Sequence, residues 1–152
     1  MKIVITCVTL LVMASCKKIN VFEKQITIPN YKWSNKFVPT FEFKNNTDSN
    51  FNLVTIVVRH TNNYPYSNLW VKLTTIHKQD TTTKDCNILL TKNNANKEWA
   101  NEGMDDIHEI RYPVKTVGNN SNDYTFMISN IMTDTTLPEI MNIGLRVEKI
   151  SY

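Results

Sequence analysis

The sequence contains little glycine, with three residues in a chain of 152, and signals for helices are scarce. Stretches rich in threonine, valine, isoleucine, tyrosine and phenylalanine alternate with short stretches rich in asparagine and aspartate. β-Branched and aromatic residues favour strands, whereas asparagine and aspartate favour turns because their side chains bond to nearby backbone. The composition therefore predicts strands joined by short polar turns.

Residues 1–15 are predicted to be a targeting segment and not part of the fold. Lys2 precedes an apolar run over residues 3–15, which is shorter than the roughly 20 residues that a membrane-spanning helix needs. The run leads into "VMASC", which resembles a bacterial lipobox with Met13 in place of the usual leucine. We therefore predict a lipoprotein signal peptide over residues 1–15, cleaved before Cys16, and one domain over residues 16–152. The alternative is an ordinary signal peptide, with Cys16 present by chance or as a disulfide partner.

Cysteine is also scarce, with three residues in the chain. Cys7 would leave with the signal peptide and Cys16 would carry the lipid, which leaves Cys86 alone and excludes a disulfide framework. In "DCNILL" we predict that Cys86 is a small buried apolar residue rather than a reactive thiol. Acyl chains on Cys16 would tether the domain to a membrane surface, since each buried methylene contributes about 0.8 kcal/mol.

The charge is small and evenly spread. The formal net charge of +3 falls to +2 when Lys2 is removed, and the basic residues form no cluster, so nothing indicates a nucleic-acid partner. The three arginines, Arg59, Arg111 and Arg146, lie in or beside predicted strands. Because guanidinium tolerates partial burial and pairs bidentately with carboxylates, we predict that they form structural ion pairs.

Eight segments are predicted to be strands, and their spacing predicts an all-β fold, an antiparallel β-sandwich or jelly roll. Alternation places Phe37, Phe41 and Phe43 on one face of their segment, and residues 136–141 are the best candidate for a single helical turn. The segment over residues 51–60 is apolar on both faces and is predicted to be central. The eight segments are residues 22–28, 37–44, 51–60, 69–77, 85–91, 106–114, 123–130 and 141–150.

The richest candidate metal site is "MDDIHEI", which holds Asp105, Asp106, His108 and Glu109. Their spacing matches neither a calcium loop nor a zinc motif, so we predict a solvated loop leading into a strand and no metal site. On a strand, Asp106 and His108 would share one face, and Asp105 and Glu109 the other. The three histidines belong to no nucleophile elbow, metalloprotease or phosphate-loop motif. We predict no catalytic residues, no cofactor and no small-molecule substrate.

The stretch "RHTNNYPYSNLW" (residues 59–70) concentrates aromatic and polar side chains between two apolar segments. Asparagines cap turn backbone and Pro65 fixes one dihedral angle, so we predict a structural corner first. Tyrosine and tryptophan also dominate many protein interfaces. Part of the loop is therefore a candidate docking surface, with Tyr64, Tyr66 and Trp70 at its centre. The candidate partner-binding residues are Arg59, His60, Tyr64, Tyr66 and Trp70.

Carbohydrate binding is the competing hypothesis. β-Sandwich domains often stack sugar rings on exposed aromatic side chains, and the chain offers five candidate rings. The opposing interpretation is that large rings in a small β-domain lie mostly in the core, where each buries about 150 to 250 Å². The candidate rings are Trp33, Trp70, Trp99, Tyr64 and Tyr66.

Residues 59–70, together with "IGLRVEK" (residues 143–149), closely resemble the two signature stretches of the gliding motility lipoprotein family GldH. "EWANEGMDDIHEIRYPV" (residues 98–114) is similar to a further segment of that family. Asn63 and His108 depart from the aspartate and tyrosine usual there, which lowers the odds of metal or catalytic chemistry.

The resemblance implies an envelope lipoprotein that is needed for surface gliding in Gram-negative bacteria and is associated with type IX protein secretion. It implies no enzymatic activity, and partners among other envelope lipoproteins and motor-complex proteins. Lys17 and Lys18 follow the anchor cysteine, with neither an aspartate for inner-membrane retention nor an acidic run for surface export. We therefore expect attachment to the outer membrane, facing the periplasm.

Overall fold

The computed structural model describes residues 21–44, 51–93, 98–100, 105–118 and 123–149. Within these residues the chain forms strands and one short 3-10 helix, η1. No helix among them is long and apolar enough to cross a bilayer. The elements are β1 (Val21–Thr27), η1 (Pro29–Tyr31), β2 (Lys32–Ser34), β3 (Thr40–Lys44), β4 (Phe51–Thr61), β5 (Asn68–His77), β6 (Asp80–Leu89), β7 (Thr91–Asn93), β8 (Glu98–Trp99), β9 (Ile107–Gly118), β10 (Asp123–Asn130), β11 (Thr136–Pro138) and β12 (Ile140–Lys149).

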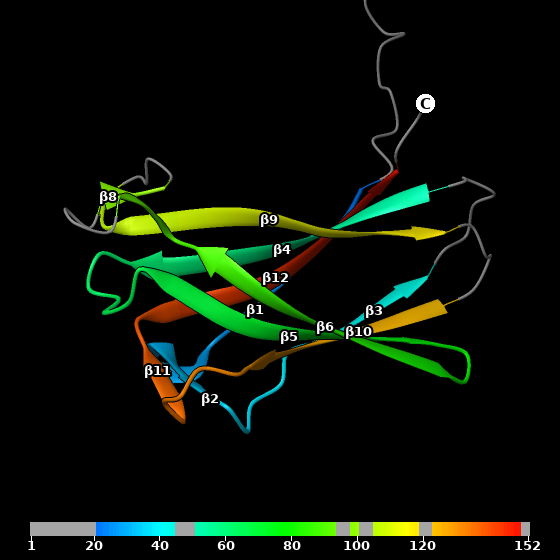
Figure 1. Cartoon of the computed structure of the whole chain (residues 1–152), viewed down its shortest axis with the longest axis horizontal. Coiled ribbons are helices and arrows are strands. Elements are labelled where there is room, and N and C mark those ends of the chain that lie inside the picture. Colours follow the sequence, from blue (N-terminus) through cyan, green and yellow to red (C-terminus); the bar gives the residue numbers. More distant parts are fainter. Residues whose placement is uncertain (1–20, 45–50, 94–97, 101–104, 119–122, 150–152) are drawn as a thin grey trace, which may run out of the picture.

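Two four-stranded antiparallel sheets form a sandwich (Figure 1). The first sheet has the order β1-β12-β4-β9 and the second the order β3-β10-β5-β6. These are the eight segments predicted to be strands. If these eight strands are numbered along the chain, the spatial order is 1-8-3-6 in the first sheet and 2-7-4-5 in the second. This is the order of a jelly roll, so the predicted all-β sandwich is confirmed.

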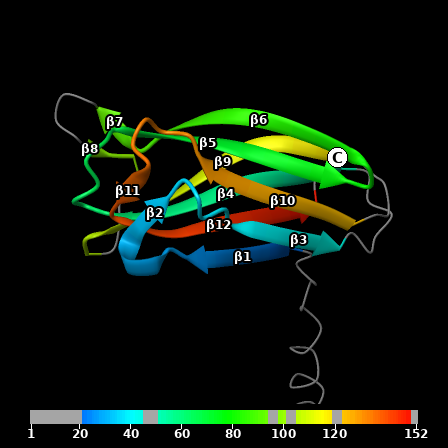
Figure 2. The ribbon, with the colours of Figure 1, turned by 90° about the horizontal axis from the view of Figure 1, so that it is seen from below.

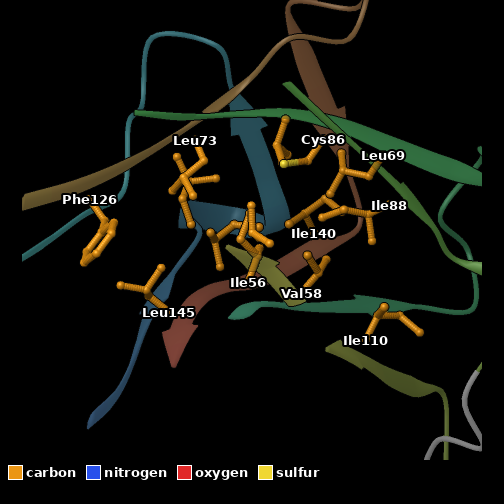
Figure 3. Close-up of a cluster of buried hydrophobic side chains, with 14 of the residues drawn as sticks. Ile56, Val58, Leu69, Leu73, Cys86, Ile88, Ile110, Phe126, Ile140 and Leu145 are labelled. Carbon is orange, nitrogen blue, oxygen red and sulfur yellow. The ribbon is translucent and has the colours of Figure 1, made fainter. Parts of the chain in front are cut away.

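The core lies between the two sheets and is built from alternate residues of each strand (Figure 3). On β4 the inward side chains are Ile56 and its neighbours two positions away, and on β5 they include Leu69 and Leu73. On β10, Phe126 is fully buried. Cys86 on β6 is also buried, which raises the pKa of its thiol and confirms the predicted apolar role.

Strand β4 is buried on both faces, as its composition predicted. Val57 points away from the core and is still only 1% exposed. It lies opposite Gly144 on β12. A Cβ on Gly144 would come within 2.8 Å of Gln25 Cγ and 3.2 Å of Val57 Cβ, so the side chain of Gln25 occupies the space that the glycine leaves. The close approach of these side chains requires a residue without a Cβ.

Two small two-stranded ribbons, β2 with β11 and β7 with β8, lie at the end of the sandwich where β4 turns into β5 (Figure 2). The predicted helical turn over residues 136–141 is wrong. These residues form β11 and the start of β12, separated by Glu139 with φ of 65°. Leu137 pairs with Trp33 across the ribbon, and both side chains are fully buried. This pairing between distant segments outweighs the local preference for a helical turn.

The prediction for Phe37 is also wrong. Strand β3 begins at Thr40, after Pro39, and Phe37 lies outside it with 37% of its surface exposed. Its carbonyl accepts a hydrogen bond from Trp33 Nε1 at 2.9 Å, which bends this segment toward the ribbon. Phe41 is buried and Phe43 packs against the core, so the predicted face holds only from Thr40 onward.

Candidate interaction surface

The loop between β4 and β5 is pinned to two distant segments by its polar residues. The Thr61 and Asn62 backbone N–H groups donate to the carbonyl oxygens of Glu139 and Asp106, at 3.1 and 3.0 Å. The Thr61 hydroxyl also donates to the Glu139 carboxylate. Asn62 donates from Nδ2 to Asp106 Oδ1 at 2.7 Å, and its Oδ1 lies 2.6 Å from His108 Nε2. These bonds make the start of the loop a corner of the fold.

A cluster of buried rings lies beneath this corner. The ring centroid of His60 is 4.6 Å from that of Trp99, 5.7 Å from Tyr64 and 5.4 Å from His108. His60 and Tyr64 are both 0% exposed. The Tyr64 hydroxyl donates to the Asn68 carbonyl at 3.3 Å, and burial raises the pKa of this hydroxyl. These rings therefore pack the corner from inside.

The polar residues of "MDDIHEI" separate between two environments. Asp106 and His108 share Asn62 at the corner, whereas Glu109 faces outward and pairs with Arg59 at 3.0 Å and Arg111 at 2.8 Å. Among the residues that the structure describes, no three histidine, cysteine, aspartate or glutamate side chains gather in a way that could hold a metal ion.

All three arginines form ion pairs on the outer face of the first sheet, which confirms the sequence prediction. Arg146 pairs with Glu23 and with Glu148, each at 2.8 Å, and Arg111 reaches Glu23 at 3.2 Å. Hydrogen bonds to Glu23 and Glu148 raise the pKa of Arg146. The network joins β1, β12, β4 and β9 across the sheet, and it includes Arg59, the first residue of the candidate stretch.

A groove of about 220 Å³ lies where the loop passes into β5. Two hydrogen bonds join its sides: the Ile131 backbone N–H donates to the Trp70 carbonyl at 3.2 Å, and the Trp70 backbone N–H donates to the side-chain sulfur of Met132 at 3.3 Å. The Tyr66 hydroxyl donates to the carboxylate of Asp134, and this bond raises the pKa of Tyr66. The groove is lined by Tyr66, Asn68, Trp70, Ile131, Met132, Thr133 and Asp134.

The five candidate partner-binding residues thus occupy three environments. Arg59 belongs to the outer ion-pair network, and His60 and Tyr64 are buried. Tyr66 and Trp70 line the groove, and Trp70 is 41% exposed. His60 and Tyr64 are buried and have no surface to offer a partner. The docking role stays a prediction, and within this loop it now concerns only Tyr66 and Trp70. Cys16 lies outside the described residues.

Residues 131–134 form half of the groove and were not found by sequence reasoning. Trp70 and Met132 are 62 positions apart, and nothing local in the sequence marks two such segments as neighbours. Of the other candidate rings for sugar binding, Trp33 is fully buried in the core and Trp99 is half-buried against it.

The fold and this surface define a jelly-roll domain with a rigid polar corner and a small surface groove beside it. Comparison with known protein families matches residues 20–147 to GldH lipoprotein. The match covers most of the chain, which therefore belongs to the GldH lipoprotein family. It is a gliding-motility-associated lipoprotein, anchored to a membrane of the cell envelope, in a family without catalytic activity.

No curated protein matches the chain. Among solved structures, it is similar to the VP2 subviral particle of infectious bursal disease virus. The identity is 8%, the TM-score is 0.22, and the match covers 88% of this chain and 36% of the viral chain. The chain thus spans about a third of that protein, and a likeness of this degree carries no argument about function.

Proposed function

We propose that this protein is an outer-membrane lipoprotein that faces the periplasm and acts as a non-enzymatic interaction component of the gliding motility machinery, associated with type IX secretion. Residues 1–15 are removed, and Cys16 carries the lipid. Its partners are other envelope lipoproteins and motor-complex proteins. The family match, together with the lipobox "VMASC", carries this proposal.

The course of the strands supports an interaction role. Val21, where β1 begins, pairs with Glu148, and Lys149 pairs with Asn52 near the start of β4. Thr61 lies nine residues farther along β4, about 30 Å away at 3.3 Å per residue. Five residues of chain from Cys16 to Val21 span at most about 18 Å. An anchor at Cys16 therefore holds one end of the sandwich near the bilayer. The turn from β4 into β5, which carries the corner and leads into the groove, lies at the other end (Figure 2).

The state of the corner histidines supports a role without catalysis. His60 is enclosed by the rings of Trp99, Tyr64 and His108. Because it is 0% exposed, no substrate reaches it without opening of the corner. His108 Nε2 is engaged with Asn62.

Acylation is tested by mass spectrometry of the N-terminal peptide from the native gliding host. We expect a peptide that starts at an acylated Cys16. Cys16→Ala should leave the protein unacylated and the cells unable to glide. The matched control is Cys86→Ala, which removes the buried core thiol and should keep both acylation and gliding. An unmodified Cys16 in wild-type cells would contradict the proposal.

The orientation of the protein and its partners are tested in intact cells. A protease added outside should leave the protein uncut until the outer membrane is opened, and digestion without lysis would exclude the periplasmic orientation. Cross-linking in the same cells should attach the chain to envelope lipoproteins or motor-complex proteins. Recovery of lipid adducts alone would count against an interaction role.

Carbohydrate binding is a second candidate, because the exposed ring of Trp70 stands beside polar groups of the groove. A sugar that binds only the native state would raise the melting temperature of the full chain by mass action. The absence of any shift across a panel of envelope oligosaccharides would remove this candidate.

A further inference from the structure

We infer that the groove beside Trp70 receives a cationic side chain, a lysine or an arginine, from a partner protein. The inference rests on the proposed interaction function and specifies the chemistry of the contact.

The charge of the groove comes from a single residue. Asp134 is the one charged residue among those that line it. Its carboxylate accepts a hydrogen bond from the Tyr66 hydroxyl, which fixes its position. Asp134 forms no ion pair with any residue of the described segments. An ionised carboxylate only accepts hydrogen bonds, so a cationic donor complements it.

The walls suit the rest of such a side chain. Trp70 presents a half-exposed indole, and Ile131 and Met132 add apolar surface. Lysine and arginine bury their methylene stems along apolar surface and keep the charged head in a polar environment. A cation over an indole face is also attracted by the ring, tryptophan being the strongest aromatic partner. Trp70 and Asp134 thus offer both halves of a cation site.

The size and the available donors distinguish this ligand from a sugar. Pockets for small molecules usually enclose about 300 to 1,000 Å³, whereas this groove measures about 220 Å³ and suits one side chain. A sugar needs donors as well as acceptors. One of the two N–H donors of the Asn68 side chain is already used in a hydrogen bond to Asn87 Oδ1 at 2.8 Å, which reduces the donors that the groove offers to a sugar.

The residues next to the groove could extend the contact, and they do not cancel the negative charge of Asp134. Lys72, the next outward position on β5, lies opposite Asp85 on β6, so these two residues add no net charge. Leu89, which is 60% exposed, lies opposite Asn68 and two positions from the partner of Trp70. A segment that places a basic residue in the groove could therefore rest an apolar neighbour on Leu89.

The test uses the full-length acylated protein in nanodiscs of uncharged lipid, with surface plasmon resonance as the readout and empty nanodiscs as the reference. The probes are blocked pentapeptides, Gly-Leu-X-Leu-Gly, in which X is arginine, lysine, citrulline or glutamate. We expect the arginine and lysine peptides to bind at least about tenfold more tightly than the citrulline and glutamate peptides.

Variants locate the binding. Trp70→Ala should weaken the arginine peptide about tenfold, and Asp134→Asn about fivefold. Tyr66→Phe keeps the ring and the carboxylate but removes the hydroxyl that holds Asp134 in place, so it should weaken the arginine peptide, by less than Asp134→Asn does. Two control variants should change the affinity less than about twofold. Ile107→Ala truncates an exposed apolar side chain on the first sheet, and Asp80→Asn lies at the start of β6, opposite the far end of β5. Melting curves confirm that each variant is folded.

The inference is overturned if peptide affinity does not depend on the charge of X, or if Trp70→Ala and Asp134→Asn bind like wild type. It is also overturned if only oligosaccharides bind at Trp70. In either case, the proposed function would still stand if Cys16→Ala cells fail to glide and the wild-type protein cross-links to envelope proteins. If no such cross-links form in wild-type cells, the proposed function itself is contradicted.

Discussion

The two halves of the stretch over residues 59–70 differ in what their aromatic side chains do. Tyr64 and Tyr66 flank the same proline, yet Tyr64 is fully buried against His60 and Tyr66 lies on the wall of a groove. The first half joins distant segments through hydrogen bonds to Glu139 and Asp106, and through ring contacts of His60 with Trp99 and His108. The second half continues onto the outer face of β5, where Trp70 is half-exposed.

The difference shows that one signature serves two purposes. Hydrogen bonds and buried rings fix where the loop runs, since a buried polar group that loses its partner costs more than an exposed one, which can bond to water. The fixed loop then presents Tyr66 and Trp70 at a defined place. A variant of the corner should therefore change stability first, whereas a variant of the groove should change binding alone.

The largest effect should come from removing a buried ring. Tyr64→Ala leaves a cavity in the corner and should lower the free energy of unfolding by about 3–5 kcal/mol. Trp70→Ala, in the other half, should lower it by less than about 1 kcal/mol. Urea unfolding of both variants of the full chain measures the contrast. Equal losses would show that the two halves form one packing unit.

A smaller effect should come from the hydrogen bonds that pin the corner. Asn62→Ala removes the side-chain bonds to Asp106 and His108. It should cost about 1–2 kcal/mol, mainly because the buried His108 loses this partner of its Nε2, whereas the exposed Asp106 can bond to water instead. The matched control is Asn63→Ala, because Asn63 is also exposed and its hydrogen bond to the Thr61 hydroxyl is made by its backbone N–H. Similar losses for both variants would argue that the asparagines serve only as turn residues.

The strands could be predicted from sequence because one buried face imposes a period of two. Leu69, Val71 and Leu73 recur at every second position of their segment, and all three are buried. The predicted helical turn failed for a different reason. Residues 136–138 pair with β2, about a hundred positions earlier, and no local pattern reveals such a pairing.

The candidate site could be predicted only in part. Composition marked residues 59–70 as a corner with aromatic side chains, but it could not tell which tyrosine would be buried. That choice depends on contacts made across the fold, such as the bond from Tyr66 to Asp134, 68 positions away. The arginines were easier, because strands that carry complementary charges bring them together wherever they pair.

The smallest effect concerns the ion pairs of the first sheet, which Arg59 connects to the stretch. A hydrogen bond from Arg146, reinforced by Arg111, outweighs burial and holds the pKa of Glu23 below its usual value. The stabilisation is therefore fully present above the unfolded pKa of about 4.3 and is lost as the pH falls through the lower folded pKa.

Glu23→Gln should therefore be less stable than wild type at pH 7 by no more than about 1 kcal/mol, since the pairs are largely exposed. The difference should shrink as the pH falls below about 4.3, and added salt should reduce it because it screens exposed charges. Urea unfolding of the full chain at pH 7 and pH 3 measures both. Glu42→Gln is the matched control, because Glu42 is exposed on β3 and forms no ion pair with a described residue. If the Glu23→Gln deficit persisted at pH 3, Glu23 would stabilise the sheet by packing, and the outer face would resemble the corner more than the groove.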